Sequence, residues 1–473
     1  MAGTKAILQQ LRDFESRNIT FIEPDGSWPM VWERARGVHV WDGDGNKYLD
    51  LTAAFGVAAA GHANPRVVRA GQKQLGRLPH AMGDVHPHAL KAQLACELSR
   101  LTFERWSRIT HHASRITAKT IFCNSGFEAV EAALKTAMLA TGKRGVIAFE
   151  GAYHGLGYGA LNATHRDFFR RPFRSQLRAF GHFVPFPVGD DVRSLKPKKG
   201  KNEPRYLGSY EIESCIRRIF RRERIGAILV EPIQGRGGIN IPPPEFLPLL
   251  RKLCDEHRAL LILDEIYTGF GRTGKWFACE HGGTAVPPVR SEATDGQDAR
   301  PAIPDLICLG KALTGGFPLS ACVGRADLMD AAWPESRGEA IHTSTFLGNP
   351  VGCAMALAQI QEIERLNLCQ RSEELGRFLL LQLQSQIANR KSQIQARGLG
   401  LMAGVELRLP NGQPATQAAM QVIKTMLQRG FILLPEGEHA NVISFTPPLT
   451  ITKTQLAKAV AALKEVLTTD GHG

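Results

Sequence analysis

Residues 303–318 read IPDLICLGKALTGGFP, and this stretch decides the fold that we expect for the chain. Its apolar run from Leu306 to Leu309 predicts a buried strand. Lys311 follows directly, and a GGFP turn comes soon after, so an amine lies at the end of a core strand where the chain bends. Residues 260–264 predict a second buried strand, which ends in the carboxylate of Asp264.

Lys311 and Asp264 together indicate a cofactor. A lysine amine forms a Schiff base with a carbonyl group. A Schiff-base lysine with an acidic partner for a pyridinium nitrogen is the arrangement that pyridoxal phosphate requires. Each residue alone has a simpler interpretation, as a solvated loop lysine and as an aspartate that caps a helix. The motifs elsewhere in the chain favour the cofactor.

Strands and helices alternate along the chain. The apolar patterns predict strands at 120–123, 145–149 and 225–230, and helices at 126–141 and 245–257. This alternation indicates βαβ units and a mainly parallel sheet. Further predictions are inserted surface loops at 187–206 and 281–301, a helix at 350–363 that leads out of the sheet domain, and a smaller domain from about residue 397.

Five segments, in chain order, resemble the class III aminotransferases, which are pyridoxal-phosphate enzymes of fold type I. They are NSGFEAVE at 124–131, AYHG at 152–155, EPIQG at 231–235, DEIYTGFGRTG at 264–274, and the stretch around Lys311. The resemblance runs from about Pro29 to Leu449, and DEIYTGFGRTG is its most specific part. It implies an α/β protein with a large domain, residues 61–345, built on a mainly parallel seven-stranded sheet. A smaller α+β domain, residues 346–473, would be joined by residues 1–60.

Residues 125–127 are predicted to bind the cofactor phosphate. They lie between a predicted strand and helix, where backbone N–H groups and the helix dipole favour an anion. The Ser125 hydroxyl adds a donor and Gly126 allows close approach, although Ser125 also suits a plain helix cap. Phe127 stands where many relatives have a small residue, so its ring needs a place elsewhere.

The resemblance implies roles for further residues of the cofactor site. Tyr153 would stack on one face of the pyridine ring, Ile266 would pack on the other, and Asp264 would bind the ring nitrogen. Tyr267 stands where several relatives have Gln, close to the ring hydroxyl. Lys311 would hold the cofactor and then move a proton. The remaining residues expected at this site are His154, Glu231 and Thr345.

Thr345 resembles the residue that crosses a dimer interface to the phosphate of the other subunit. The expectation is therefore a homodimer with shared active sites. We also expect that no metal takes part. An ordinary turn residue is the alternative interpretation of Thr345.

The residues on the substrate side depart from relatives that act on 4-aminobutyrate or ornithine. Leu156 stands where they often have Arg, Arg236 where they have Glu, and Ser444 where they have the Arg that binds a substrate carboxylate. Phe55 is expected in the wall of the substrate pocket. With Ser444 nearby and no glutamate to neutralise it, Arg236 is predicted to bind the carboxylate of the acceptor. A surface arginine in a glycine-rich loop is the alternative.

The sequence thus predicts an aminotransferase that moves an amino group from a primary amine or ω-amino acid to an α-keto acid in ping-pong order. An aminomutase, epimerase or decarboxylase of the same fold is the alternative within the cofactor class. A protein that kept the fold and lost the chemistry is the alternative from another class, and the intact Lys311 and Asp264 argue against it.

Composition narrows the setting. The net charge is +13, and residues 166–224 carry sixteen Lys or Arg against seven Asp or Glu. Such a stretch suits nucleic acid or, as we favour, a solvated loop with an exposed helix face, because no nucleic-acid motif accompanies it. No apolar run approaches the roughly 20 residues of a membrane span. Residues 1–20 lack the apolar core of a signal, and nine scattered cysteines favour a reducing cytoplasm.

Overall fold

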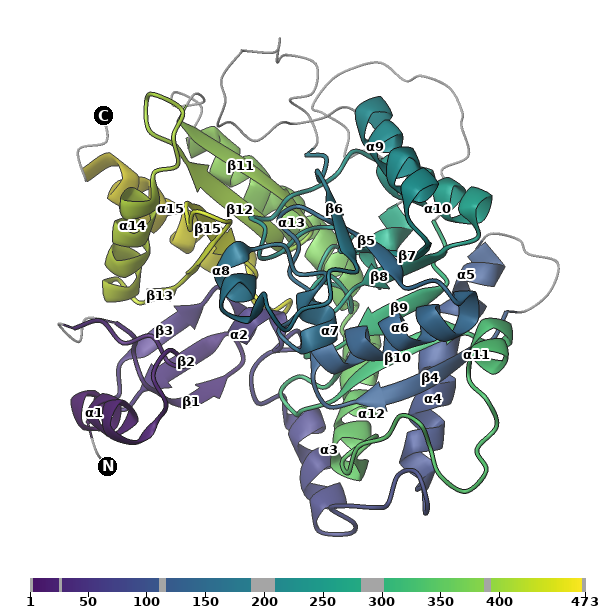
Figure 1. Cartoon of the computed structure of the whole chain (residues 1–473). Helices are drawn as coiled ribbons and strands as arrows, with labels where there is room; N and C mark the ends of the chain where they lie inside the picture. Colours follow the sequence, from purple (N-terminus) through teal and green to yellow (C-terminus); the bar gives the residue numbers. More distant parts are fainter. Residues whose placement is uncertain are drawn as a thin grey trace.

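The computed structural model describes residues 3–24, 28–109, 116–188, 209–281, 302–386 and 393–469. Its centre is a seven-stranded sheet with the order β4-β10-β9-β8-β7-β5-β6 (Figure 1). The strands are β4 (Ala118–Cys123), β5 (Gly145–Phe149), β6 (Gly181–Val184), β7 (Ile225–Val230), β8 (Leu260–Asp264), β9 (Leu306–Leu309) and β10 (Ser320–Arg325). Neighbours from β6 to β9 are parallel, and β10 runs antiparallel to both β9 and β4. The predicted mainly parallel, seven-stranded sheet is confirmed.

Both faces of the sheet are buried, which explains why its strands are apolar throughout. Leu261 and Leu263 of β8 face the core that contains α10 (Phe246–His257). Ile262, between them, faces the core that contains α6 (Gly126–Thr141). The predicted helix at 126–141 is confirmed, and the one predicted at 245–257 begins one residue later. Helix α12 (Pro350–Arg365) begins as predicted and extends two residues further.

The other helices surround this sheet and the two smaller sheets. They are α1 (Thr4–Phe14), α2 (Ala53–Gly56), α3 (Pro65–Leu75), α4 (Ala89–Leu101), α5 (Phe103–Ile109), α7 (Tyr158–Leu161), α8 (Asp167–Arg170), α9 (Ser209–Arg222), α11 (Ala326–Ala332), α13 (Leu368–Gln386), α14 (Thr416–Gln428) and α15 (Lys453–Thr469), with short 3-10 turns η1 (Arg171–Phe173), η2 (Ala278–His281) and η3 (Lys311–Leu313). None of the described helices is long and apolar enough to cross a membrane.

Two four-stranded sheets lie beside the central one. The first contains β1 (Trp32–Arg36), β2 (His39–Asp42), β3 (Lys47–Asp50) and β13 (Phe431–Ile432). The second contains β11 (Ile394–Leu399), β12 (Met402–Leu407), β14 (Leu434–Glu436) and β15 (Val442–Phe445). Because β13 pairs in parallel with β3, Leu49 lies opposite Phe431, and the N-terminal strands join C-terminal elements (Figure 1, purple beside yellow-green). The domain boundaries at residues 60 and 345 stay a prediction.

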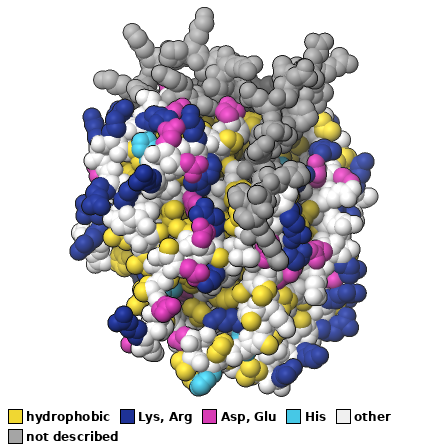
Figure 2. Space-filling model, turned by 90° about the vertical axis from the view of Figure 1, so that its right-hand side faces the viewer, with side chains coloured by type: hydrophobic (Ala, Val, Ile, Leu, Met, Phe, Trp, Pro, Cys, Tyr) yellow, Lys and Arg dark blue, Asp and Glu magenta, His cyan; other side chains and the backbone are white. Residues whose placement is uncertain are grey.

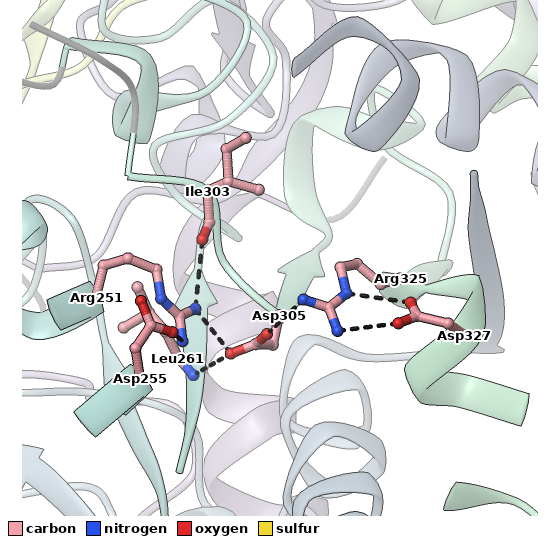
Figure 3. A network of polar contacts seen from close by, with 7 residues as sticks. All are labelled: Arg251, Asp255, Leu261, Ile303, Asp305, Arg325 and Asp327. Carbon is pink, nitrogen blue, oxygen red and sulfur yellow. Dashed lines mark hydrogen bonds and ion pairs between the residues drawn. The ribbon is translucent and has the colours of Figure 1, made fainter. Parts of the chain in front are cut away.

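A network of charged side chains holds the amino end of β9 (Figure 3). The buried Asp305 carboxylate accepts the backbone N–H of Leu261 at 2.8 Å and contacts Arg251 Nη1 at 2.8 Å. Arg325 Nη1 lies 3.4 Å from its other oxygen and also pairs with Asp327. These contacts join β8, β9, β10 and α10 at one end of the sheet, which leaves the carboxyl ends of β8 and β9 at the other end.

The basic stretch divides between described and undescribed residues. The predicted loops at 187–206 and 281–301 lie almost wholly outside the described residues, and so do the lysines at 196–201. On α9, Arg217 pairs with Glu213 and Glu256, whereas Arg218 and Arg221 are exposed. Figure 2 shows a face on which Lys and Arg are interspersed with Asp and Glu.

Candidate active site

Lys311 lies at the carboxyl end of β9 on a strained backbone. Its φ of 42° is left-handed, a conformation that residues with side chains adopt mainly where the surroundings impose it. The amine Nζ lies over the face of Tyr267, 3.9 Å from the ring centroid. Burial lowers the pKa of Lys311, and the carboxylates of Asp264, Glu231 and Glu436 oppose this shift. The amine therefore loses its proton more easily than an exposed lysine does.

Tyr267 forms the floor beneath this amine. A Cβ on Gly235 would lie 2.3 Å from the Tyr267 ring, and a Cβ on Gly56 would lie 2.6 Å from it, so both positions need glycine to leave room for the ring. The Tyr267 hydroxyl lies 3.2 Å from Thr446 Oγ1. It thus has a partner within the protein, while its predicted bond to the cofactor stays a prediction.

Asp264 lies at the carboxyl end of β8, the strand next to β9. Its carboxylate is buried, with Oδ2 at 2.8 Å from His154 Nδ1 and Oδ1 accepting the backbone N–H of Ile266 at 3.1 Å. His154 is itself buried, and its Nε2 has no hydrogen-bond partner among the described residues. The contact assigns His154 a role that sequence reasoning did not give it, which is to hold the Asp264 carboxylate in place.

Glu231 joins two loops around this carboxylate. Its oxygens accept the backbone N–H groups of Tyr153 at 3.0 Å and Gly235 at 3.1 Å. Burial raises the pKa of Glu231 to about 7, opposed by His154 and by these two N–H groups, while Asp264 adds to the rise. Glu231 therefore positions the Tyr153 loop relative to the loop after β7.

The predicted phosphate turn lies where β4 meets α6. The Glu128 carboxylate accepts the backbone N–H groups of Asn124 at 2.6 Å and Ser125 at 3.2 Å, which fixes the turn. Ser125 and Glu128 also form a capping box, as the helix-cap alternative expected, and the buried Ser125 hydroxyl makes no other hydrogen bond among the described residues. A Cβ on Gly126 would lie 3.1 Å from Ile266, which follows Asp264 by two positions. The structure thus brings the turn, Asp264 and Lys311 together.

The ring of Phe127 packs against the loop that carries Tyr153. A Cβ added to Gly155 would lie 2.3 Å from Phe127, and one added to Gly157 would lie 2.5 Å from it. The bulky residue is therefore accommodated by two glycines that follow His154. This pairing links the start of α6 to the AYHG segment.

The prediction that no glutamate neutralises Arg236 is wrong. Arg236 does have an acidic partner, because its Nη1 lies 3.2 Å from Oε2 of Glu436, at the end of β14. Sequence reasoning missed Glu436 because it lies far away in the chain and in no motif. The Ser444 hydroxyl is also engaged, since it donates to the carbonyl oxygen of Leu434 at 3.1 Å within the sheet.

Phe55 and Thr345 lie at the edges of this region. Phe55 is half exposed, and it follows two further residues with positive φ, so the backbone is strained where it passes Tyr267. Thr345 is exposed. Its neighbour Ser344 lies 3.2 Å from Asn124 Nδ2, which places the Thr345 segment beside the phosphate turn of the same chain.

These groups fit pyridoxal phosphate. The Ser125 turn offers an anion the N-terminus of a sixteen-residue helix and a hydroxyl that makes no hydrogen bond beyond the helix cap among the described residues. Asp264 offers a carboxylate fixed by His154 to a ring nitrogen, and Lys311 offers an amine to a carbonyl. The donor set covers the phosphate, the ring and the carbonyl of the cofactor.

The chain belongs to the class III aminotransferases, whose family model matches residues 22–467. It is 35% identical over 452 residues to the 5-aminovalerate aminotransferase DavT of Pseudomonas aeruginosa, covering 92% of this chain and 93% of the relative. It is 36% identical over 450 residues to a putrescine aminotransferase of Pectobacterium atrosepticum, covering 93% and 83%. The chain is therefore a transaminase that depends on pyridoxal phosphate.

Solved structures show the same fold. An ω-transaminase from Pseudomonas jessenii in complex with PMP superposes with a TM-score of 0.82 at 24% identity, covering 97% of both chains. A transaminase from the marine bacterium Virgibacillus gives a TM-score of 0.82 at 23% identity, covering 98% of both chains. These similarities confirm the predicted fold type I.

Proposed function

We propose that the chain takes the amino group from a primary amine or ω-amino acid and gives it to an α-keto acid, with Lys311 as the residue that binds the cofactor carbonyl and moves the proton. The proposal rests on the buried Lys311 amine at the end of β9, which lies over the Tyr267 ring at 3.9 Å. The carboxylates of Asp264, Glu231 and Glu436 oppose the lowering of its pKa by burial. The names of the relatives, which specify 5-aminovalerate and putrescine, support a donor whose amino group ends a chain.

Each site residue would have a defined task. Bound at this site, pyridoxal phosphate supplies a carbonyl that exchanges for an amino group and a ring that withdraws electrons. Asp264 would hold a proton at the ring nitrogen, and His154 would keep its carboxylate oriented. The lowered pKa of Lys311 would let its neutral amine take a proton from the substrate carbon and return it. Tyr153 and Ile266 would keep water from the ring.

The proposal includes a homodimer in the cytoplasm, with Thr345 completing the phosphate site of the partner. Exposed apolar side chains support the dimer, since Met82, Val85 and Phe346 are exposed on two segments that Thr343 joins by donating to Asp84 at 2.7 Å. His80 contacts the ring of Phe346 at 5.3 Å between centroids, which joins the two exposed segments into one surface. A second copy of this chain would cover it.

Reduction with borohydride followed by peptide mass mapping tests Lys311. The adduct is expected on Lys311, and an adduct on any other lysine refutes the assignment. Lys311→Ala is expected to keep the cofactor through the Ser125 turn and to lose turnover, while Lys252→Ala, an exposed lysine on α10, serves as the matched control. Formation of CO₂ or of an isomerised amine, with no aldehyde from the donor, would favour a decarboxylase or aminomutase instead.

A further inference from the structure

Glu436 is a buried acid with an incomplete set of partners. Its side chain is 1% exposed, and neither carboxylate oxygen accepts a hydrogen bond from the described residues. Its ion pair is with Arg236 at 3.2 Å. Burial raises the pKa of Glu436 to about 7, with Arg236 and Lys311 opposing the rise, Glu231 adding to it and Arg166 opposing it. A buried carboxylate left in this condition is costly to the fold.

Other buried glutamates of the chain are satisfied. Glu265 accepts hydrogen bonds from Thr268 Oγ1 and from the backbone N–H groups of Ala278 and Cys279. Glu406 pairs with Arg397 at 2.6 Å and with Arg408 at 2.7 Å. These two carboxylates hold the fold together, and the contrast indicates that Glu436 does not have that task.

The two members of the Arg236–Glu436 pair differ in their freedom. The backbone around Arg236 is held, because Gly437 donates its N–H to the Arg236 carbonyl at 3.0 Å. The Arg236 side chain is 31% exposed, so its guanidinium is able to leave Glu436 and turn toward solvent. Glu436 is enclosed at the end of β14 and stays in place. When Arg236 leaves, an acid is exposed to whatever occupies the site.

The acid also lies close to the reacting amine. Its partner Arg236 follows Gly235, where an added Cβ would lie 2.3 Å from the Tyr267 ring, and the Lys311 amine lies over that ring at 3.9 Å. The pair therefore borders the same space as the Lys311 amine, and Glu436 opposes the lowering of the pKa of Lys311. A donor whose first amino group reaches Lys311 has the rest of its chain in this space. A carboxylate there attracts a cation and disfavours an anion.

We propose that Glu436 binds the second ammonium group of an α,ω-diamine donor, which takes the place of the Arg236 guanidinium. The inference rests on the proposed amino transfer and names its donor. In the other half-reaction, after the donor has left, Arg236 pairs with Glu436 again through Nη1 and offers its remaining N–H groups to the carboxylate of the keto acid. One ion pair thereby serves two substrates of opposite charge.

Two amines of equal length test the proposal with pyruvate as acceptor, namely 1,4-diaminobutane and 1-aminobutane. Glu436→Gln is expected to lower kcat/KM for the diamine on the order of 10- to 100-fold, as loss of a charged hydrogen bond does. The monoamine should be unaffected or improved. Glu438→Gln, an exposed acid two residues away, is the control and should change neither. Equal losses with both amines, or no loss with the diamine, overturn the proposal.

Two further measurements distinguish diamine binding by Glu436 from a structural role of this residue. They also test the Glu436 assignment independently of amino transfer. The melting temperature of Glu436→Gln should equal or exceed that of the unmutated protein, because a buried charge is removed. Calorimetric binding of the two amines to Lys311→Ala protein needs no turnover, and there Glu436→Gln should weaken only the diamine. Failure of that difference sinks the Glu436 assignment even if amino transfer is demonstrated. Arg236→Ala should raise KM for pyruvate and leave diamine binding intact or tighter.

Discussion

Asp264 and Asp305 are a matched pair for testing which buried aspartate acts in catalysis. Each is 5% exposed, and they lie at opposite ends of neighbouring strands, Asp264 at the carboxyl end of β8 and Asp305 directly before β9. Asp264 contacts His154 and one backbone N–H group, whereas Asp305 binds Arg251, Arg325 and the N–H of Leu261. Substitution by Asn keeps the shape of each and removes its charge.

Asp264→Asn should slow the chemical step with little change in stability. A charge-assisted bond to the ring nitrogen contributes roughly 1.5–3 kcal/mol, and losing about 3 kcal/mol at the transition state slows the rate on the order of 10²-fold. The new amide still has an oxygen that can accept from the backbone N–H of Ile266, and its NH₂ group offers His154 a partner, so the fold loses little. The amide has no negative charge with which to keep the ring nitrogen protonated.

Asp305→Asn should behave in the opposite way. Oδ2 of Asp305 accepts from both Leu261 and Arg251, and an NH₂ group at either position leaves donors facing donors, at a cost of about 2–4 kcal/mol. Single-turnover kinetics and urea unfolding of both variants measure the two effects separately. A near-normal rate in Asp264→Asn, or a loss of stability as large as that of Asp305→Asn, would refute the catalytic assignment.

Two further predictions concern charge and assembly. Burial raises the pKa of Glu231 and Glu436 to about 7, above the roughly 4.3 of an unfolded glutamate. Between these two pH values the native state holds protons that the unfolded state has lost. The free energy of unfolding therefore falls as the pH rises from about 4.3 to 7. Across that range the free energy of unfolding of Glu436→Gln should fall less than that of the unmutated chain. An identical pH dependence of the two would contradict the raised pKa of Glu436. If Thr345 completes the partner's phosphate site, dilution that separates the subunits should release cofactor, as followed by sedimentation with absorbance detection; an active monomer saturated with cofactor would exclude the shared site.

Strands of the central sheet could be predicted because each is marked by the residues of its own short segment. Residues 145–149 and 225–230 are short apolar runs bounded by turns, and burial on both faces makes every residue of such a run apolar. Asp264 and Lys311 were predicted to act together because each follows a buried strand, and the parallel pairing of β8 with β9 places both at the same edge of the sheet. The antiparallel β10 was not predicted because Ser320–Arg325 reads SACVGR, in which Ser, Gly and Arg interrupt the apolar run.

The partners of the site residues could not be predicted in the same way. His154 was expected at the cofactor, but nothing in AYHG says that its Nδ1 contacts Asp264, 110 residues later. Glu436 ends a three-residue strand and carries no motif, so its meeting with Arg236 depends on how the C-terminal sheet docks. Contacts between side chains of different sheets depend on the complete tertiary structure.

The pairing of β3 with β13 has a consequence for synthesis of the protein. Leu49 leaves the ribosome long before Phe431, its neighbour in the finished sheet. At the usual 5–20 residues per second, about 20 to 75 s pass between them. During that time β3 has an unpaired edge, which is a template for association with other chains. The central sheet is able to form in that interval, but the N-terminal strands must wait for the last part of the chain, so nascent chains that stall before residue 431 are the ones expected to need a chaperone.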